Sequence, residues 1–461
     1  MLHKLTKIWF WLAILVAGFL WGIACLHFKI FPYSVLQSAK NAAEAWVWVL
    51  DAQPTTFVRF EGTRSAPPTA RDAAAANTEF ILIGGGPREN LPACPEFGCL
   101  AWIVDRHGKI RHTWQIDPQV IIEGMTGYSG AITRDNLKPH DWYLSAQGDL
   151  FVIFESIGTY PYGGSIAKFD WHGKLIWSTN NRAHHWMTVD QNGMMYMPAL
   201  KTAATPYSLG NTKAELECEQ GGIEIDTISV VNPSGEVIEE IDVLEKLLAH
   251  GLVGLLRDTA SDCDPLHLNF VQVIWPELAQ NVPELDVGDL IVSVRNINAM
   301  VLLSAGRRDV KWLFAGHTAR QHSPRPNAQG DILIFDNYGG PRAFGGSRLA
   351  KTRVGWQSAK TIFPTPQSDP NIDFFTPKAG HIVRHPTANR VLVALTSNGR
   401  ILEIDLDGGK VIWQYHKQFD SLNYPGAEQD SAENPFVRVE AYGAYYVMDT
   451  AIMARLGKVG Q

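Results

Sequence analysis

The sequence has no excess of basic residues. Lys and Arg number 40 against 47 Asp and Glu in 461 residues, which gives a formal net charge of −7. No run of Lys or Arg stands out along the chain. Domains that bind nucleic acid usually carry a basic patch or stripe that faces the phosphate backbone. The charge balance therefore argues against a nucleic-acid partner.

Cysteine is also scarce, with five residues in the whole chain. A second closely spaced cysteine pair is missing, so a structural zinc site is not expected. An even number of cysteines beyond Cys25 favours disulfides if the chain is exported. We predict a disulfide between Cys94 and Cys99, which bracket the short loop CPEFGC. Whether Cys218 and Cys263 pair or remain thiols is left open.

Charged residues are missing from one stretch near the N-terminus. The chain runs uncharged from Ile8 to Leu26, close to the roughly 20 apolar residues that span a bilayer. The two lysines before this run favour a cytoplasmic N-terminus. We predict that residues 1–30 form an uncleaved transmembrane helix in the cytoplasmic (inner) membrane, with the remaining chain in the periplasm or outside the cell. A cleaved signal is the alternative, because small residues precede Cys25.

The texture of the chain changes near residue 79. Residues 35–55 have the pattern of a short helix followed by a linker, and residues 62–78 are rich in Pro and Ala, which is typical of a loop. From residue 79 onward, short apolar runs alternate with glycine-containing turns, as in β-structure. We therefore assign a helix and linker to residues 31–78 and a β-domain to residues 79–461.

One hairpin unit recurs through this domain. An apolar run leads to a turn with Asp or Asn and then Gly, and a second apolar run follows that often ends in Trp. Such turn residues tolerate the positive φ of a tight reversal. The unit occupies residues 100–114, 165–178, 228–241 and 401–414, with weaker copies at 300–314 and 347–363. Six copies, roughly 50 to 70 residues apart, predict an all-β fold, a six-bladed β-propeller with four short strands in each blade.

A histidine recurs at one register in the other half of the repeat. In four repeats it stands eight residues before the Gly or Asn of the turn, and in a fifth the interval is 21 residues, longer by 13. The first strand of each propeller blade lines the central channel, so equivalent positions form a ring around the axis. We expect these histidines to converge at one mouth of the channel. They are His140, His185, His267, His322 and His381.

The last repeat lacks this histidine. Residues 436–448 offer Arg438 instead, followed by strand-like residues but no second hairpin. We expect the ring to close by pairing of these last strands with the N-terminal hairpin at residues 100–114, because closure removes the exposed sheet edges.

A ring of imidazoles suits either metal binding or group transfer. First-row metal sites usually include carboxylates or keep short ligand spacings, and no carboxylate shares the histidine register. We therefore predict no metal and no other cofactor. Neutral imidazole is a nucleophile near pH 7, and a protonated neighbour can hold an anion or protonate a leaving group. Transfer of a negatively charged group is the favoured interpretation, and histidines that cap strands are the structural alternative.

Several segments resemble a known enzyme family. They are DPLHLNFVQV with GDLIVSVRNINAM, QHSPRPNAQGDILIFDN, the paired-histidine segment AHHWMTVDQNGMMYM, and the insertion GEVIEEIDVLEKLLAHGLVGLL before the Asp-x-x-His-x-Asn motif. Together they resemble the bacterial arylsulfotransferases, which move sulfate from one phenol to another without a nucleotide donor. The likeness runs from about residue 80 to 445.

The resemblance implies a six-bladed propeller with its active site at the channel mouth. His322 would take the sulfuryl group as a sulfohistidine and pass it to an acceptor phenol. His267 and Arg295 would bind the sulfuryl oxygens, and His185 would assist unless the adjacent His184 takes that place. Fixed donors stabilise the charge that spreads over the peripheral oxygens in such a transition state.

Further residues are assigned to substrate binding with less defined roles. Asn269 would orient a neighbouring group, whereas His140, His381 and Arg438 would shape the pocket. The two prolines that follow His322 in SPRPN depart from the family pattern. A small phenolic sulfate donor and a phenol acceptor are the expected partners, with membrane contact through the N-terminal helix. The sequence does not name the donor or acceptor, and it leaves homo-oligomerisation open.

Other functions are less well supported. A nucleotide-dependent sulfotransferase would need a phosphate-cradling GxxxxGK[ST] loop, which is absent, and a formylglycine sulfatase would need a Cys or Ser motif that is also absent. A non-catalytic, membrane-anchored scaffold remains the main alternative. Leucines at helical spacing also predict a helix at about residues 243–256, which either packs against the domain or forms a lid over the channel.

Overall fold

The computed structural model describes residues 2–28, 31, 57–60, 69–70, 79–87, 89, 91–94, 96–219, 222–420 and 436–458. The chain divides into two compact units, Met1–Ala52 and Gln53–Gln461. In the first unit, helix α1 spans Leu2–Phe28. Among the residues with described positions, no helix meets the length and hydropathy of a candidate membrane span. The helix predicted within residues 35–55 lies outside the described residues.

The second unit is all-β and propeller-like. Consecutive hairpins form antiparallel sheets, and the first strands of neighbouring sheets contact one another. One sheet has the order β6 (Leu137–Leu144), β7 (Leu150–Ser156), β8 (Gly163–Phe169) and β9 (Leu175–Ala183). A single residue pair, Ala183 with Ala199, joins it to β11 (Met195–Ala203), β14 (Ile223–Val231) and β15 (Val237–Asp242), and β10 (Thr188–Val189) also pairs with β11.

Three further sheets follow along the chain. Their strands are β16 (Leu268–Val273), β17 (Leu290–Val294), β18 (Ala299–Leu303) and β19 (Val310–Ala315); then β20 (His322–Pro326), β21 (Ile332–Asp336), β22 (Arg348–Thr352) and β23 (Lys360–Phe363); and then β24 (His381–Arg384), β25 (Arg390–Leu395), β26 (Arg400–Asp405) and β27 (Lys410–His416). The inner strands β17, β18 and β21 are rich in Val, Ile and Leu and are buried along their whole length, so both of their faces pack inside the domain. Apolar side chains of neighbouring sheets fill the space between them, as Ile225, Leu268 and Val292 do in one cluster.

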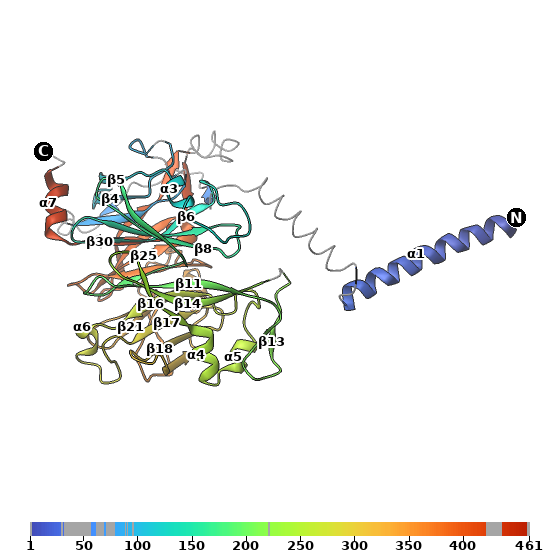
Figure 1. Ribbon diagram of the computed structural model, residues 1–461. Coiled ribbons are helices and arrows are strands. Elements are labelled where there is room, and N and C mark those ends of the chain that lie inside the picture. Colours follow the sequence, from blue (N-terminus) through green and yellow to red (C-terminus); the bar gives the residue numbers. More distant parts are fainter. Residues whose placement is uncertain are drawn as a thin grey trace. The chain divides into compact units, whose positions relative to one another are not determined.

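The chain closes on itself through its last strand. Strand β30 (Ala444–Val447) pairs with β3 (Phe80–Gly84), which pairs with β4 (Ala101–Asp105) and through it with β5 (Ile110–Trp114). Figure 1 accordingly shows orange and red strands beside blue ones in the second unit. The predicted closure is confirmed in part: β30 shares a sheet with the hairpin at residues 100–114, but it pairs with β3 rather than with the hairpin, and the other C-terminal strand, at Phe436–Val439, lies in a different sheet. All six predicted hairpins are confirmed as strand pairs.

Short strands complete the topology. Strand β29 (Phe436–Val439) lies between β1 (Phe57–Phe60) and β28 (Gln418–Asp420), β2 (Thr69–Ala70) adds to β27, and β12 (Tyr207–Ser208) pairs with β13 (Glu215–Leu216). The helix predicted at about 243–256 is wrong in extent, because it is two helices, α4 (Val243–Ala249) and α5 (Val253–Arg257). Gly251 separates them with a positive φ of 85°, which a continuous helix does not allow.

Three short helices and two disulfides complete the second unit. The long turn after β16 contains the short helix α6 (Pro276–Ala279), and α3 (Gln119–Ile122) and α7 (Thr450–Lys458) lie elsewhere in the unit. The predicted Cys94–Cys99 disulfide is confirmed, and Cys218 also pairs with Cys263.

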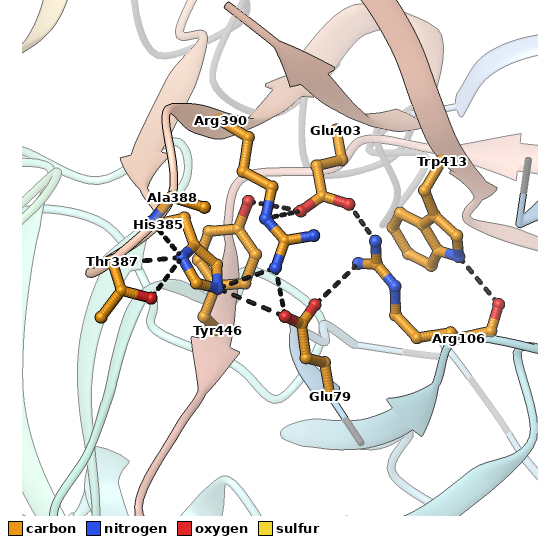
Figure 2. A network of polar contacts seen from close by, with 9 residues as sticks. All are labelled: Glu79, Arg106, His385, Thr387, Ala388, Arg390, Glu403, Trp413 and Tyr446. Carbon is orange, nitrogen blue, oxygen red and sulfur yellow. Dashed lines mark hydrogen bonds and ion pairs between the residues drawn. The ribbon is translucent and has the colours of Figure 1, made fainter. Parts of the chain in front are cut away.

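A buried polar network joins the closing sheet to the sheet of β24–β27 (Figure 2). Glu403 on β26 pairs with Arg106 beyond β4 and lies 3.4 Å from Nε of Arg390, while its Oε1 accepts a 2.8 Å hydrogen bond from Tyr446 on β30. Glu79 pairs with Arg390 and lies 4.0 Å from Arg106. The Glu403 side chain is wholly buried and that of Arg106 is 2% exposed. Two carboxylates thus balance two guanidinium groups where the closing sheet meets the sheet of β24–β27.

The network predicts a large stability effect for Glu403→Gln. The amide keeps the size of the side chain but leaves two buried guanidinium groups to share one carboxylate, which typically costs about 3–5 kcal/mol. We expect the urea midpoint of unfolding to fall accordingly. Glu284→Gln, at an exposed position, is the matched control. A midpoint equal to that of this control would contradict the assignment.

Candidate functional site

A cavity of about 380 Å³ lies where the first strands of several sheets meet, and it contains most of the predicted site. Four of the five register histidines line it, together with Arg295. A groove of about 430 Å³ beside Phe363 and Trp413 holds none of the predicted site residues. The residues that line the first cavity are His140, Glu155, Tyr162, His185, Glu224, Asp264, His267, Arg295, His322, Lys378, Ala379 and Tyr442.

His322, the first residue of β20, is held in one tautomer by Asn337. The Nδ2 group of Asn337 donates to the carbonyl oxygens of Thr376 at 2.9 Å and Ala379 at 2.8 Å. These two acceptors fix the amide, so its Oδ1 faces the imidazole and accepts from Nδ1 of His322 at 2.7 Å. The proton therefore resides on Nδ1, and Nε2 carries the lone pair.

Burial keeps this imidazole neutral. His322 is 1% exposed, and burial lowers its pKa well below the usual value, against the opposite effect of the Asn337 hydrogen bond. Because only the neutral form has a lone pair on Nε2, the residue is ready as a nucleophile at neutral pH.

The two prolines after His322 are accommodated by an irregular strand. The pairing of β20 with β21 shifts between His322 and Arg325, which marks a bulge, and Ser323 has a positive φ of 50°. Strand β20 is also the edge strand of its sheet, and proline is tolerated on edge strands and at bulges because no ladder hydrogen bond is lost there. The departure from the family pattern therefore coincides with a bulge beside the histidine.

His267 immediately precedes β16 and Arg295 immediately follows the paired strand β17, and both line the cavity. The Nδ1 atom of His267 pairs with the Asp264 carboxylate, and the backbone N–H of Arg295 donates to the carbonyl of His267 at 3.2 Å. Burial alone would raise the pKa of Asp264, but His267 lowers it below the usual value. The carboxylate thus fixes the ring, which leaves Nε2 of His267 for a ligand.

The paired histidines have different places. His185 lines the cavity, whereas His184 is fully buried behind it, with Nε2 at 3.2 Å from Asp226. Their Nδ1 atoms lie 2.8 Å apart, so only one of the two carries a proton. Burial lowers the pKa of His184 to about 4 and that of His185 well below the usual value. His185 is thus the member of the doublet that a substrate could touch.

Backbone strain gathers around this cavity. His185, His267 and Ala379 line it and have positive φ angles of 56°, 51° and 52°. Residues other than glycine rarely adopt this conformation, and it persists mainly where function or packing demands it. The first strands also carry bulges here, at His140 on β6 and at Asn269 on β16. Bulges re-aim side chains and are frequent beside active sites.

Besides His184, three residues assigned to substrate binding are not among those that line the cavity. Asn269 donates to the backbone carbonyl of Gln321 at 2.8 Å, which ties β16 to the residue before His322. Nε2 of His381 accepts from Arg325 at 2.7 Å, and its ring stacks on Trp186. Arg438 lies on β29, outside the closing sheet, and donates to Nδ1 of His416 at 2.9 Å. Tyr442, which precedes β30, stands at the cavity instead.

The sequence argument missed Asn337 and Glu155, which share a second register with the predicted Arg295. Asn337 follows His322 by 15 residues, and Glu155 follows His140 by the same interval. Arg295 follows His267 by 28 residues, which is the same interval lengthened by the 13-residue insertion. These positions end the second strand of each hairpin, beside the start of the first strand. No carboxylate shares the register of the histidines themselves. A carboxylate, that of Glu155, nevertheless reaches the histidines from the neighbouring strand β7.

Likenesses to solved structures are weak. A protein of unknown function from Bacteroides caccae is 10% identical, with a TM-score of 0.44 over 76% of this chain and 96% of its own. A streptogramin B lyase is 12% identical, with a TM-score of 0.38 over 74% of this chain and 88% of its own. The Neurospora crassa Pan2 WD40 domain is 12% identical, with a TM-score of 0.36 over 72% and 85%. No curated protein matches the chain.

A sequence family matches more strongly. The arylsulfotransferase (ASST) family matches residues 145–418, more than half of the 461 residues. The matched range contains His185, His267, Arg295 and His322, all of which line the cavity. It is shorter than the range of about 80 to 445 over which the sequence resembles the family. The match supports sulfotransferase activity in general, and the chain belongs to the arylsulfotransferase family.

Proposed function

We propose that the protein transfers a sulfuryl group from an aryl sulfate to a phenol through a sulfohistidine at His322. Nε2 of His322 attacks the sulfur, the bond between sulfur and the aryl oxygen breaks, and a phenolate leaves. An acceptor phenol then loses its proton to solvent, its oxygen attacks the same sulfur, and the N–S bond breaks. The single observation that carries this proposal is the Asn337 contact, which places the lone pair of a buried, neutral imidazole on Nε2.

The neighbouring residues have separate roles in this proposal. Arg295 and His267 hold the peripheral oxygens, where negative charge spreads in the transition state. Asp264 keeps the His267 ring in place through Nδ1. His185 lies at the cavity close to His267, with ring centroids 4.9 Å apart, and would assist by contacting the transferred group as a neutral imidazole. Asn337 would stabilise the positive ring of the sulfohistidine by accepting its Nδ1–H.

We further propose that the second unit is a six-bladed propeller with this cavity at one mouth of its channel. Six four-stranded groups support the count: β30–β3–β4–β5, β6 to β9, β10–β11–β14–β15, and the three sheets that begin at β16, β20 and β24. The residues assigned to the wider pocket, His381 and Arg438, would then act through Trp186 and His416, which they contact.

The N-terminal segment is proposed to anchor the protein in the cytoplasmic membrane or to serve as its export signal. Apolar side chains on α1 are largely exposed, among them Trp9, Phe10 and Phe19, and exposed apolar surface of this extent favours a lipid environment. Retention of the intact N-terminus in the membrane fraction after high-salt and alkaline washes is expected. Complete release of the full-length chain would contradict anchoring.

The test of the function uses the purified chain with p-nitrophenyl sulfate. We expect nitrophenol release that accelerates when phenol is added, together with the appearance of phenyl sulfate, because acceptor attack regenerates the histidine. A rate of nitrophenol release that does not change when phenol is added would indicate hydrolysis rather than transfer. No release with any aryl sulfate would favour a non-catalytic scaffold, in which the His322 and Arg295 side chains are dispensable.

A further inference from the structure

Beside the proposed nucleophile, three side chains form a cluster with the composition of a metal site. His140, Glu155 and His185 each place one donor atom so that the three atoms lie within 4.8 Å of one another. Glu155 Oε2 lies 2.7 Å from Nδ1 of His140, and its Oε1 lies 3.5 Å from Nδ1 of His185. All three residues line the 380 Å³ cavity.

His140 is an unusual buried imidazole. It is 4% exposed, and its Nδ1 pairs with Glu155 Oε2 at 2.7 Å. Its Nε2 makes no hydrogen bond with any of the described residues. Buried polar atoms in native proteins nearly always have a partner, and an exception often marks an ion or a catalytic role. The unpartnered Nε2 points to a ligand other than the described side chains.

The backbone prepares this arrangement from three directions. His140 is the bulged residue of β6, because Pro139 pairs with Phe154 and Asp141 pairs with Ile153. The backbone N–H of His185, a residue with positive φ, donates to Glu155 Oε1 at 2.8 Å. The cluster is therefore assembled by a bulge, a paired strand and a strained loop rather than by chance contact of mobile side chains.

We infer that His140, Glu155 and His185 form a binding site for a first-row divalent cation of the Zn²⁺ type. Zn²⁺ binds imidazole nitrogen and carboxylate oxygen at about 2.0–2.2 Å, so donors on one ion lie roughly 3–4 Å apart. Two histidines and one glutamate constitute a common catalytic zinc set, which leaves a further position for water or substrate. Imidazole-rich sites disfavour Mg²⁺ and Ca²⁺, which prefer all-oxygen ligands.

The surroundings of the cluster match those of known zinc sites. Nδ1 of His184 lies 2.8 Å from Nδ1 of His185 and would orient that ring, as residues behind metal ligands usually do, so Nε2 of His185 is the nitrogen that remains for the ion. Trp186 and Tyr442 pack against His140, with ring centroids 5.0 and 4.5 Å away, and exclude water from one side. The other side opens to the cavity, so a bound ion could polarise an anionic oxygen there. That catalytic role rests on the proposed function, whereas the binding of the ion does not.

The test measures Co²⁺ and Zn²⁺ binding by the full chain after treatment with a chelator. We expect about one Co²⁺ per chain, seen as visible d–d absorption that Zn²⁺ abolishes. His140→Ala and Glu155→Gln should each weaken the affinity at least ~100-fold, which exceeds the typical cost of losing an orienting residue. Glu155→Gln keeps the shape of the side chain and serves if His140→Ala does not fold. His317→Ala, outside the cavity, is the control and should bind as the wild type does.

The outcomes separate this inference from the proposed function. No Co²⁺ uptake by the wild type at millimolar concentration, or equal uptake by the wild type and both variants, would overturn the metal site. Nitrophenol release is then measured on the same samples. Co²⁺ uptake without sulfuryl transfer would support the metal site and contradict the proposed function. Sulfuryl transfer without any Co²⁺ uptake would support the proposed function and contradict the metal site.

Discussion

Replacement of His322 by alanine is expected to abolish sulfuryl transfer. The variant lacks the only protein atom that the proposed mechanism joins to sulfur, so kcat with p-nitrophenyl sulfate should fall at least about 10⁴-fold, as losses of a covalent nucleophile do in other enzymes. Steady-state release of nitrophenol measures the effect. A fall of less than tenfold would contradict the assignment of the nucleophile.

Two further variants distinguish loss of the nucleophile from loss of the fold. His322→Ala leaves Oδ1 of Asn337 without its 2.7 Å partner, which typically costs about 1–3 kcal/mol. His322→Gln restores a polar partner but no nucleophilic nitrogen, so it should be folded and equally inactive. His317, in the same segment but outside the cavity residues, is the matched control, and His317→Ala should retain full activity.

Replacement of Arg295 by alanine is expected to lower kcat/KM by about 10²–10³, the usual cost of removing one fixed donor from a developing negative charge. Arg295→Lys should recover only part of this loss, because an ammonium group lacks the planar fork that meets two sulfuryl oxygens at once. Kinetics with aryl sulfates of different leaving-group pKa would show the loss across the whole series.

The matched control for Arg295 lies on the surface. The side chain of Arg307 is 87% exposed and pairs with Asp309, so Arg307→Lys should leave kcat/KM unchanged. An equal effect of the two lysine variants would mean that general charge, rather than an oxygen contact at Arg295, governs the rate.

The sequence predicted the strand pairing of the domain well because hairpin pairing depends on residues that are close together in the chain. The Asp/Asn-Gly turns and apolar runs fix each hairpin locally, and all six hairpins formed where expected. The prediction of one helix at about 243–256 was wrong because leucine spacing alone does not reveal that Gly251 adopts a positive φ and ends the first helix. Arg438 was predicted to line the pocket because it follows the last repeat. It lies instead on β29, which belongs to a separate sheet, and the chain joins the closing sheet only afterwards.

The site was predicted in part, and the missing part has a physical reason. A register along the first strands identified His140, His185, His267 and His322, which line one cavity. Their partners belong to the second strands, and a search restricted to histidine did not include them. Glu155 and Asn337 each follow their histidine by 15 residues, so a comparison across the hairpin would have found them. The bulges that aim these side chains arise from strand pairing, which the sequence pattern does not reveal.

The most direct measurement of the central claim is the mass of the peptide that contains His322 after rapid reaction with an aryl sulfate in the absence of acceptor. The account predicts an acid-labile sulfuryl adduct on His322, present in the wild type, lost on addition of phenol and absent from His322→Gln. An adduct on another residue, or steady transfer with no adduct on any peptide, would contradict the sulfohistidine mechanism.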